Sequence, residues 1–208
     1  MASGLVQRWL RTGREEETPA QCRRGRHVLQ TPGLRLQTPT LWDRRIMQAG
    51  ASDPQAQRWL GWPEQDVTPE RDREHLLALP AGRGRVLSGT GGSLWWLAAV
   101  DPADNRVAGL IVVDWDTGEI GCSLAPRFRG RGLGTGLFAS AAEFAHYHLG
   151  IPSITAGTEP GNAACVGALA SAGFIRVAGP DTHYLPDGRV VPARWFRHES
   201  AEPTTCGA

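Results

Sequence analysis

The most informative segment of this chain is APRFRGRGLGTGL, residues 125–137. It lies between an apolar run typical of a strand and an apolar periodicity typical of a helix. Glycine occupies every second position from 130 to 136, so backbone amides can approach a ligand closely, and the helix that follows adds the positive end of its dipole. With Arg129 and Arg131 alongside, this arrangement predicts a binding site for a diphosphate.

Two common phosphate-binding motifs are excluded. A dinucleotide fingerprint needs GxGxxG, but Thr135 stands three residues after Gly132, and Leu137 stands three residues after Gly134. All 22 basic residues are arginine, so no lysine is available for a P-loop or for a pyridoxal Schiff base. A plain glycine-rich turn would not explain four glycines and two arginines at one helix start. An anion site built from backbone and arginine is therefore the interpretation we adopt.

The segments on either side predict a mixed α/β (α+β) sheet. Strands expected at 93–100, 106–115 and 119–124 are separated by the turns DPADN and DTG, a pattern typical of an antiparallel meander. Beyond the glycine-rich stretch, expected helices alternate with expected strands. These are helices at 132–149 and 162–172 and strands at 154–158, 174–177 and 190–196. Ahead of the meander we expect a strand at 34–36 and helices after Pro39, at 53–60 and at 70–79.

Length and composition suit one domain. The chain has 208 residues, of which 41% are hydrophobic and 21% charged, enough to bury a core of its own. We expect residues 1–30 to be an N-terminal extension, either without fixed structure or with one short helix at 4–12. The domain itself is expected over residues 31–199, followed by a flexible C-terminal tail at 200–208.

Charge, hydropathy and cysteine usage narrow the partners. The formal net charge of +1 gives no general attraction to nucleic acid or to an anionic membrane, and no apolar run approaches the ~20 residues of a membrane helix. Four cysteines without a CxxC pair fit a reducing cytoplasm better than a secreted disulfide framework. His146 and His148 are two residues apart on a helix and cannot form a metal pair. We expect them at the surface, and we expect no metal.

The glycine-rich segment and the segments around it resemble those of a known protein family. Arg129-Gly-Arg-Gly-Leu-Gly134 matches the R/Q-x-x-G-x-G/A signature of the GNAT superfamily of acyl-CoA-dependent N-acyltransferases. SDPQAQRWLGWP (52–63) is similar to the N-terminal helical segment of the branch that contains the ribosomal-protein alanine N-acetyltransferases, and EIGCSLAP (119–126) is similar to its fourth strand. The resemblance runs from about 31 to 198. It implies a single GNAT-like domain with a mixed, mostly antiparallel central sheet, flanked by helices and splayed between its fourth and fifth strands.

The resemblance also implies acetyl-CoA as co-substrate. Its pyrophosphate would lie on the amides of the glycine-rich loop, and its pantetheine arm would pair with the edge of the fourth strand. Asn162 would bond that arm, cap the helix behind it, or do both. The residues implied for the coenzyme are Cys122, Ser123, Leu124, Arg129, Gly130, Arg131, Gly132, Leu133, Gly134, Thr135, Asn162 and Cys165.

Acyl transfer to an amine requires a base, a polarised carbonyl and a proton for the departing thiolate. Glu119 lies where several members of this family place a carboxylate base, although a strand-end glutamate is often only a solvated surface residue. Many members carry a tyrosine as proton donor, but this chain has Leu169 there. The ribosomal-protein branch has a serine three residues after its motif asparagine, and here that residue is Cys165. A thiol can donate a proton, but a buried cysteine often serves as a small hydrophobe.

The acceptor is less well defined by the sequence. Trp59 and Trp62 lie in the segment that borders the acceptor cleft in this family, and either line the pocket or only pack; Asp114 is a further candidate contact. The most economical function is an acetyl-CoA-dependent N-acetyltransferase in which the primary amine of a small molecule attacks directly in a ternary complex. Two alternatives remain, a ribosomal-protein-like N-terminal acetyltransferase and a catalytically silent acyl-CoA-binding regulatory module. The oligomeric state stays open, with a homodimer as one option.

Overall fold

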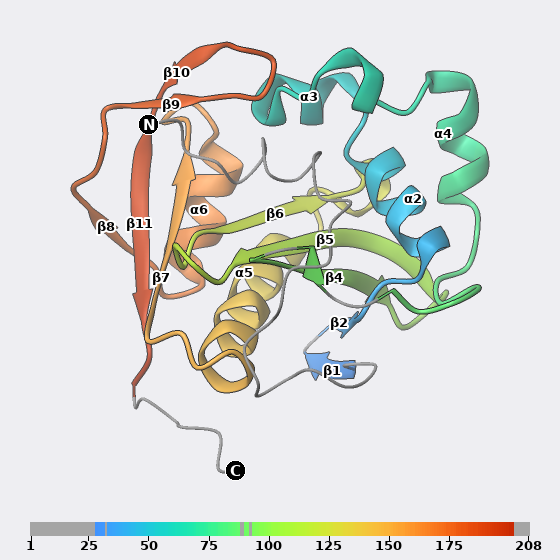
Figure 1. Cartoon of the computed structure of the whole chain (residues 1–208), viewed down its shortest axis with the longest axis horizontal. Helices are drawn as coiled ribbons and strands as arrows, with labels where there is room; N and C mark the ends of the chain where they lie inside the picture. Colours follow the sequence, from blue (N-terminus) through green and yellow to red (C-terminus); the bar gives the residue numbers. More distant parts are fainter. Residues whose placement is uncertain (1–27, 32, 88–89, 92, 202–208) are drawn as a thin grey trace.

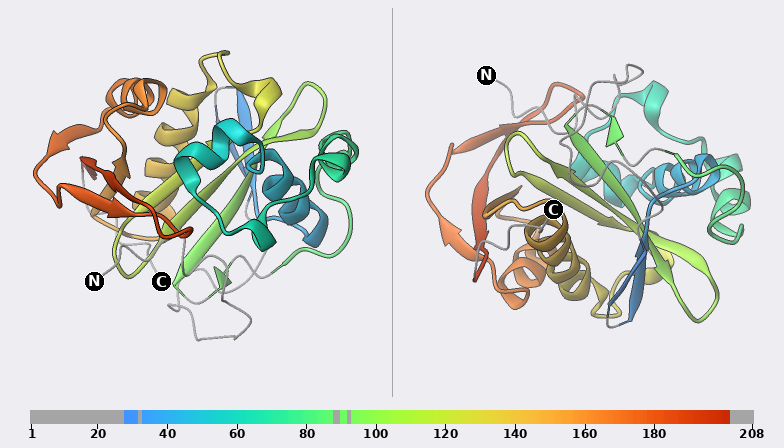
Figure 2. Two further views of the ribbon diagram at one scale, coloured as in Figure 1. Left: turned by 90° about the horizontal axis from the view of Figure 1, so that it is seen from above. Right: turned by 60° about the horizontal axis from the view of Figure 1, so that its bottom comes forward.

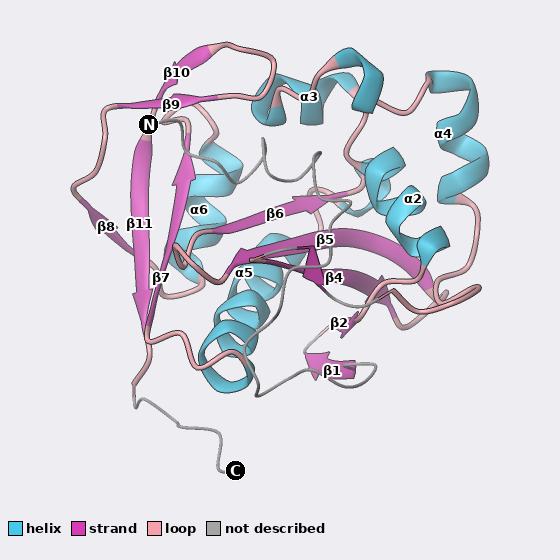
Figure 3. Ribbon diagram, in the orientation of Figure 1, coloured by secondary structure: helices cyan, strands magenta, loops and turns pink. Residues whose placement is uncertain are grey.

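The computed structural model describes residues 28–31, 33–87, 90–91 and 93–201 (Figure 1). The expected helix at 4–12 lies outside the described residues, as does the tail beyond 201. Within the described residues the chain forms two larger sheets and a separate two-stranded hairpin, with helices packed around them, as the colouring by secondary structure shows (Figure 3). No helix among these residues is long and apolar enough to cross a membrane.

The main sheet contains the expected antiparallel meander. Its strand order is β1-β2-β4-β5-β6, with the short β3 paired to β4. The DPADN and DTG turns connect β4 to β5 and β5 to β6, as predicted. The strands are β1 (Val28–Thr31), β2 (Leu34–Gln37), β3 (Thr90–Gly91), β4 (Leu94–Asp101), β5 (Arg106–Asp114) and β6 (Ile120–Leu124).

The second sheet is formed by the C-terminal part of the chain. It has the order β7-β11-β8, from β7 (Ser153–Thr158), β11 (Arg194–Glu199) and β8 (Ile175–Val177). The strand predicted at 190–196 is in fact two strands. β10 (Val190–Pro192) pairs with β9 (Thr182–Tyr184) in a separate hairpin, and the chain turns into β11 after Ala193, whose N–H donates to the Asp181 carbonyl at 2.8 Å.

The two sheets touch at one parallel bridge and then diverge. Glu119, just before β6, bridges Thr155 in β7, and the Thr155 N–H donates to the Gly118 carbonyl at 2.9 Å. Beyond this point β6 pairs only with β5, and β7 only with β11, among the described strands. The expected splay between the fourth and fifth strands of the family fold is therefore present, between β6 and β7. The predicted mixed, mostly antiparallel fold is confirmed.

Helices cover the two faces of the main sheet (Figure 2). α2 (Leu41–Gly50), α3 (Pro54–Leu60) and α4 (Glu70–Leu77) lie on one face, while α5 (Leu133–Glu143) and α6 (Ala163–Ser171) lie on the other. Short turns are η2 (Glu64–Asp66), η3 (Pro126–Phe128) and the π-helical η4 (Phe144–His148). β4 is buried on both faces, because Trp95 packs into the core beneath α5 while Trp96 packs into the core beneath α2.

The π-turn η4 corrects one expectation. His146 was expected at the surface, but its side chain is buried, with 5% of its area exposed. Its Nδ1 lies 2.6 Å from the Ile151 carbonyl, and its Nε2 lies 2.9 Å from Nδ1 of His198 in β11. The wider π-turn thus places this imidazole between helix and second sheet, where the protein provides partners for both ring nitrogens.

Candidate active site

A cavity of about 690 Å³ lies where β6 and β7 diverge. Its walls come from β6, β7, the glycine-rich loop with α5, one side of α6, α3, and the β9–β10 hairpin. Thirteen of the residues singled out from the sequence line it: Trp59, Glu119, Cys122, Ser123, Leu124, Arg129, Gly130, Gly132, Leu133, Gly134, Thr135, Asn162 and Cys165.

The edge of β6 offers backbone groups to this cavity. The Asp114 N–H donates to the Glu119 carbonyl at 2.8 Å, and the Ala125 N–H donates to the Ala108 carbonyl at 2.9 Å. Because antiparallel strands alternate the direction of their backbone groups, Ile120, Cys122 and Leu124 direct theirs away from β5, toward the divergence. An extended ligand rich in amides can pair with such an edge as an added strand does.

The start of α5 offers a second set of donors. Gly132, its N-cap, has φ +75°, and no described side chain caps the first turn. The first amides of a helix have no intrahelical partner and lie at the positive end of the dipole. Leu133, Gly134 and Thr135 line the cavity here. A Cβ at Gly134 would come within 3.2 Å of the Ala168 Cβ, so glycine keeps this wall close to α6 without crowding.

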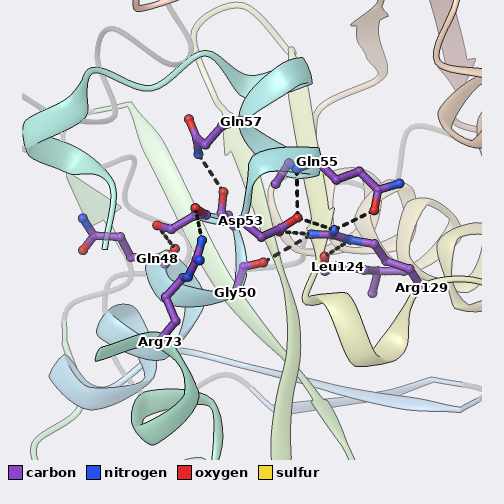
Figure 4. Close-up of polar contacts among 11 residues, drawn as sticks. Gln48, Gly50, Asp53, Gln55, Gln57, Arg73, Leu124 and Arg129 are labelled. Atoms are coloured by element: carbon purple, nitrogen blue, oxygen red, sulfur yellow. Dashed lines mark hydrogen bonds and ion pairs between the residues drawn. The ribbon is translucent and has the colours of Figure 1, made fainter. Parts of the chain in front are cut away.

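Arg129 forms a connection between the glycine-rich loop and α3 (Figure 4). Its Nη1 and Nη2 donate to the two carboxylate oxygens of Asp53 at 2.8 and 2.6 Å, and its Nε donates to the Leu124 carbonyl at 2.8 Å. Asp53 is also the N-cap of α3. Burial raises the pKa of the Asp53 carboxyl, but the hydrogen bonds and charge of Arg129, with the α3 amides, outweigh this and lower it. The Arg129 guanidinium therefore has its own counter-ion inside the protein.

Three predicted site residues lie elsewhere. Arg131 is absent from the cavity lining; it is half exposed, and its Nη1 lies 3.8 Å from Asp101. Trp62 is buried in the core beneath α2, so it packs rather than faces the cavity. Asp114 is buried at the β5–β6 turn, where Oδ1 accepts from the Asp116 N–H at 3.0 Å. These positions separate Trp59, which lines the cavity, from Trp62 and Asp114, which do not.

Two thiols and one side-chain amide line the cavity between β6 and α6. Cys122 and Cys165 are free cysteines on β6 and α6. Burial raises the pKa of the Cys165 thiol despite a hydrogen bond with Thr158, and burial together with Cys165 raises that of Cys122 well above its usual value. Both are thus protonated at neutral pH. Asn162 caps α6, its Oδ1 accepting from the Cys165 N–H at 3.2 Å, and it still lines the cavity.

The β9–β10 hairpin contributes residues that the sequence did not reveal. His183, Leu185 and Val191 line the cavity opposite α5 and α6. The hairpin is fastened to α3, because the Arg189 guanidinium donates to the Gln57 and Arg58 carbonyls at 2.9 and 3.0 Å. The only signal of a hairpin in this segment was the turn LPDGR. Because 190–196 was predicted as a single strand, the β9–β10 hairpin was not predicted.

Comparison with known proteins agrees with this architecture. The family model of the acetyltransferase (GNAT) domain matches residues 33–175, which is more than half of the chain. The chain therefore belongs to the GNAT acetyltransferase family and is an acyltransferase. The resemblance drawn from the glycine-rich stretch is confirmed. No curated protein matches the sequence.

Solved structures show the same fold at low sequence identity. A GNAT-family acetyltransferase from Bacillus anthracis has a TM-score of 0.61 at 14% identity, covering 83% of this chain and 98% of that one. Spermidine N-acetyltransferase from Vibrio cholerae, solved with CoA and spermine, has a TM-score of 0.60 at 15% identity, with coverage of 81% and 96%. Ribosomal-protein-S5-alanine acetyltransferase from Vibrio fischeri has a TM-score of 0.58 at 12% identity, with coverage of 86% and 100%.

The described residues do not form a recognisable metal site. Among the residues described by the structure, no group of three or more histidine, cysteine, aspartate or glutamate side chains is placed to hold a metal ion.

Proposed function

We propose that this protein is an acetyl-CoA-dependent N-acetyltransferase in which the primary amine of a small molecule attacks the thioester directly in a ternary complex. One observation carries the proposal. The outward-facing edge of β6, the uncapped start of α5 and the thiol of Cys165 all meet in a single cavity. This is the combination that an acyl thioester with an amide-rich arm and a diphosphate requires.

The residues present fit the coenzyme. The amides from Gly130 to Thr135 would hold its diphosphate, since Arg129 donates its own amide to the Pro126 carbonyl and its side chain to Asp53. The backbone of Cys122 to Leu124 would hold the pantetheine arm, with Asn162 at its side. Once bound, acetyl-CoA supplies the activated acetyl group. The protein has to orient the acceptor and manage the protons.

Direct transfer agrees with the state of the two thiols. A cysteine nucleophile has to be a thiolate, which a lowered pKa favours, whereas burial raises the pKa of both Cys122 and Cys165. A protonated Cys165 is instead suited to donate its proton to the departing sulfur of the coenzyme. Leu169, which replaces the usual tyrosine, is completely buried in the core and offers no alternative donor.

The two alternatives predict different outcomes in one assay. Purified protein is incubated with acetyl-CoA and a panel of primary amines that includes small metabolites and peptides with alanine or serine N-termini, and thiol release is followed. We expect release with small amines. Release only with the peptides would assign an N-terminal acetyltransferase, and calorimetric binding without release would assign a silent binding module.

We propose the GNAT domain at residues 31–199, to which residues 28–30 are joined because β1 pairs with β2 in the main sheet. We also propose a cytoplasmic location and no role in binding nucleic acid or membrane. The net charge of +1 and the four cysteines without a CxxC pair support these assignments. Size-exclusion chromatography with light scattering distinguishes a monomer from a homodimer.

A further inference from the structure

His183 occupies the wall of the cavity that faces the proposed coenzyme site. It lies in β9 opposite Val191 of β10, and both line the cavity. On the same side α3 contributes Trp59 and Leu60. Because Arg189 holds this hairpin against α3, the wall is a fixed surface. α5 and α6, the proposed coenzyme-binding elements, lie on the other side of the main sheet (Figure 2).

The imidazole of His183 packs against an aromatic ring, and no described residue forms a hydrogen bond with it. Its ring lies edge-on to Trp195, with 6.2 Å between centroids and an interplanar angle of 75°. Nδ1 is buried and has no hydrogen-bond partner among the described residues. Buried polar atoms in native proteins are nearly always paired, so the unpaired Nδ1 of a residue that lines the cavity points to a partner from outside the described residues. By contrast, His146 and His198 are bonded to each other.

The protonation state of His183 suits the acceptance of a proton. Burial lowers its pKa from the usual value, so the ring is neutral at pH 7 and carries a basic lone pair. An imidazole is intrinsically a stronger base than a carboxylate, by about 2 pKa units in reference peptides. Among the histidines in the described part of the chain, His183 is the one that lines the cavity.

We propose that His183 is the general base that removes the first proton from the ammonium group of the acceptor. This rests on the proposed function. The residue acts at the acceptor end of the cavity, where it would contact the amine directly, and the apolar groups of Trp59, Leu185 and Val191 would receive the carbon skeleton of a small amine.

The protons balance with two bases. A cationic amine loses two protons during acetylation. His183 takes the first and frees the lone pair, and Glu119 takes the second after the C–N bond has formed. As the C–S bond breaks, its electron pair stays on sulfur, which receives the proton of Cys165. His183 and Glu119 then release their two protons to solvent, Cys165 takes one proton back, and one net proton is released for each acetyl group transferred. Each residue thus has a separate task.

The test compares His183→Asn with wild type across pH, using an amine that wild type acetylates. We expect turnover to fall by ~10²- to 10⁴-fold, the acid limb of the rate profile to disappear, and the Kd of acetyl-CoA to stay within a factor of about two. His183→Ala should regain activity when imidazole is added. His75→Asn, an exposed position on α4, is the matched control and should behave as wild type.

Two results would overturn the assignment of His183 alone. One is an active His183→Asn with an unchanged pH profile. The other is a fall in turnover with the acid limb intact and no rescue of His183→Ala by imidazole, which would make the residue merely structural. A wild-type protein that binds acetyl-CoA but acetylates no amine would instead overturn the proposed function, and the role of any base with it.

Discussion

At the scale of single residues, the site depends on groups whose surroundings fix their proton content. Cys165 stands at the start of α6, hydrogen-bonded to Thr158 in β7, and burial keeps its thiol protonated. The same burial would make a thiolate costly, so Cys165 can give a proton only when its neighbour is a stronger base. In the proposed reaction the departing thiolate of the coenzyme would be desolvated in the same cavity, which would raise its proton affinity as well.

Substitution of Cys165 tests this role. If it is the proton donor, Cys165→Ala should lower turnover, whereas Cys165→Ser should retain much of it because a hydroxyl can also donate. Each change costs about 1 kcal/mol of stability through lost contacts or a buried hydroxyl. Pre-steady-state turnover at saturating acetyl-CoA is the measurement. Equal rates for Cys165→Ala and wild type would remove the thiol from the mechanism.

Glu119 is tested by Glu119→Gln, which keeps the shape and removes the basic carboxylate. The residue lines the cavity at the bridge between the two sheets. As second base it should matter less for binding than for chemistry, so we expect turnover to drop by ~10²- to 10⁴-fold with the acetyl-CoA Kd little changed. Single-turnover kinetics measure the chemical step. An unaffected step would leave the second proton to water.

The residues that could be predicted from the sequence are those whose role depends on backbone position. Glycines 130–134 and the edge of β6 line the cavity as expected, because a strand–loop–helix unit fixes where amides lie. The fate of long side chains could not be predicted. Arg129 was assigned to phosphate, yet it pairs with Asp53, 76 residues away in sequence. His183 could not be predicted, because it reaches the cavity only through the packing of the β9–β10 hairpin against α3, which is distant in sequence.

At the scale of elements, the Arg129–Asp53 pair holds the glycine-rich loop against α3, which carries Trp59. Asp53→Asn keeps an N-cap oxygen but removes the charge. Because the two side chains are largely shielded, with 23% and 16% of their areas exposed, we expect a loss of ~1 kcal/mol. A moved α3 should raise KM for the amine more than the Kd of acetyl-CoA. Asp72→Asn, more than half exposed, is the control. Unchanged stability and KM would deny the pair this role.

The start of α5 is tested through coenzyme binding. Acetyl-CoA at a hundredfold excess over its Kd should stabilise the wild type by ~2.7 kcal/mol through mass action. Gly134→Glu should abolish this, because the side chain would crowd Ala168 and its charge would repel a diphosphate. Gly134→Ala meets the same contact without the charge and separates the two effects. Thermal unfolding with and without acetyl-CoA measures both. Full stabilisation of Gly134→Glu would place the diphosphate elsewhere.

The order of helices and strands could be predicted from the sequence. Two local features, the break between β10 and β11 and the π-turn η4, could not. Alternating apolar runs with turn residues between them specify the meander, and α5 and α6 follow from their apolar faces and glycine stops. The break at Ala193 could not be predicted, since β10 and β11 read as one run of strand-forming residues. The π-turn was equally hidden, because one extra residue in a helical turn leaves the composition unchanged.

At the scale of the whole molecule, one bridge pairs the two sheets among the described strands, so contacts between the second sheet and the helices also affect overall stability. His146 in η4 and His198 in β11 form one such contact between helix and second sheet, with stacked rings whose centroids are 5.1 Å apart. Phe174 lies against His198 as well, at 5.1 Å between centroids. The 2.9 Å contact between the ring nitrogens has room for one hydrogen, so two charged rings would place N–H against N–H.

This connection should make the fold sensitive to acid. Burial and then His146 lower the pKa of His198, while Glu199 opposes them. As the pH falls, His198 is therefore protonated near pH 6.5 in the unfolded chain but only at a lower pH in the folded chain. Stability from this group is complete above about pH 6.5 and is lost as the pH falls through the lowered folded-state pKa.

Urea unfolding at pH 7.5 and pH 5 measures this effect. The free energy of unfolding should fall less between these pH values in His198→Asn than in wild type, whereas His75→Asn should behave as wild type. Because His183 also has a lowered pKa, some acid loss should persist in His198→Asn and diminish further in the double variant with His183→Asn. An identical pH dependence in wild type and His198→Asn would show that the histidine pair does not couple protonation to folding.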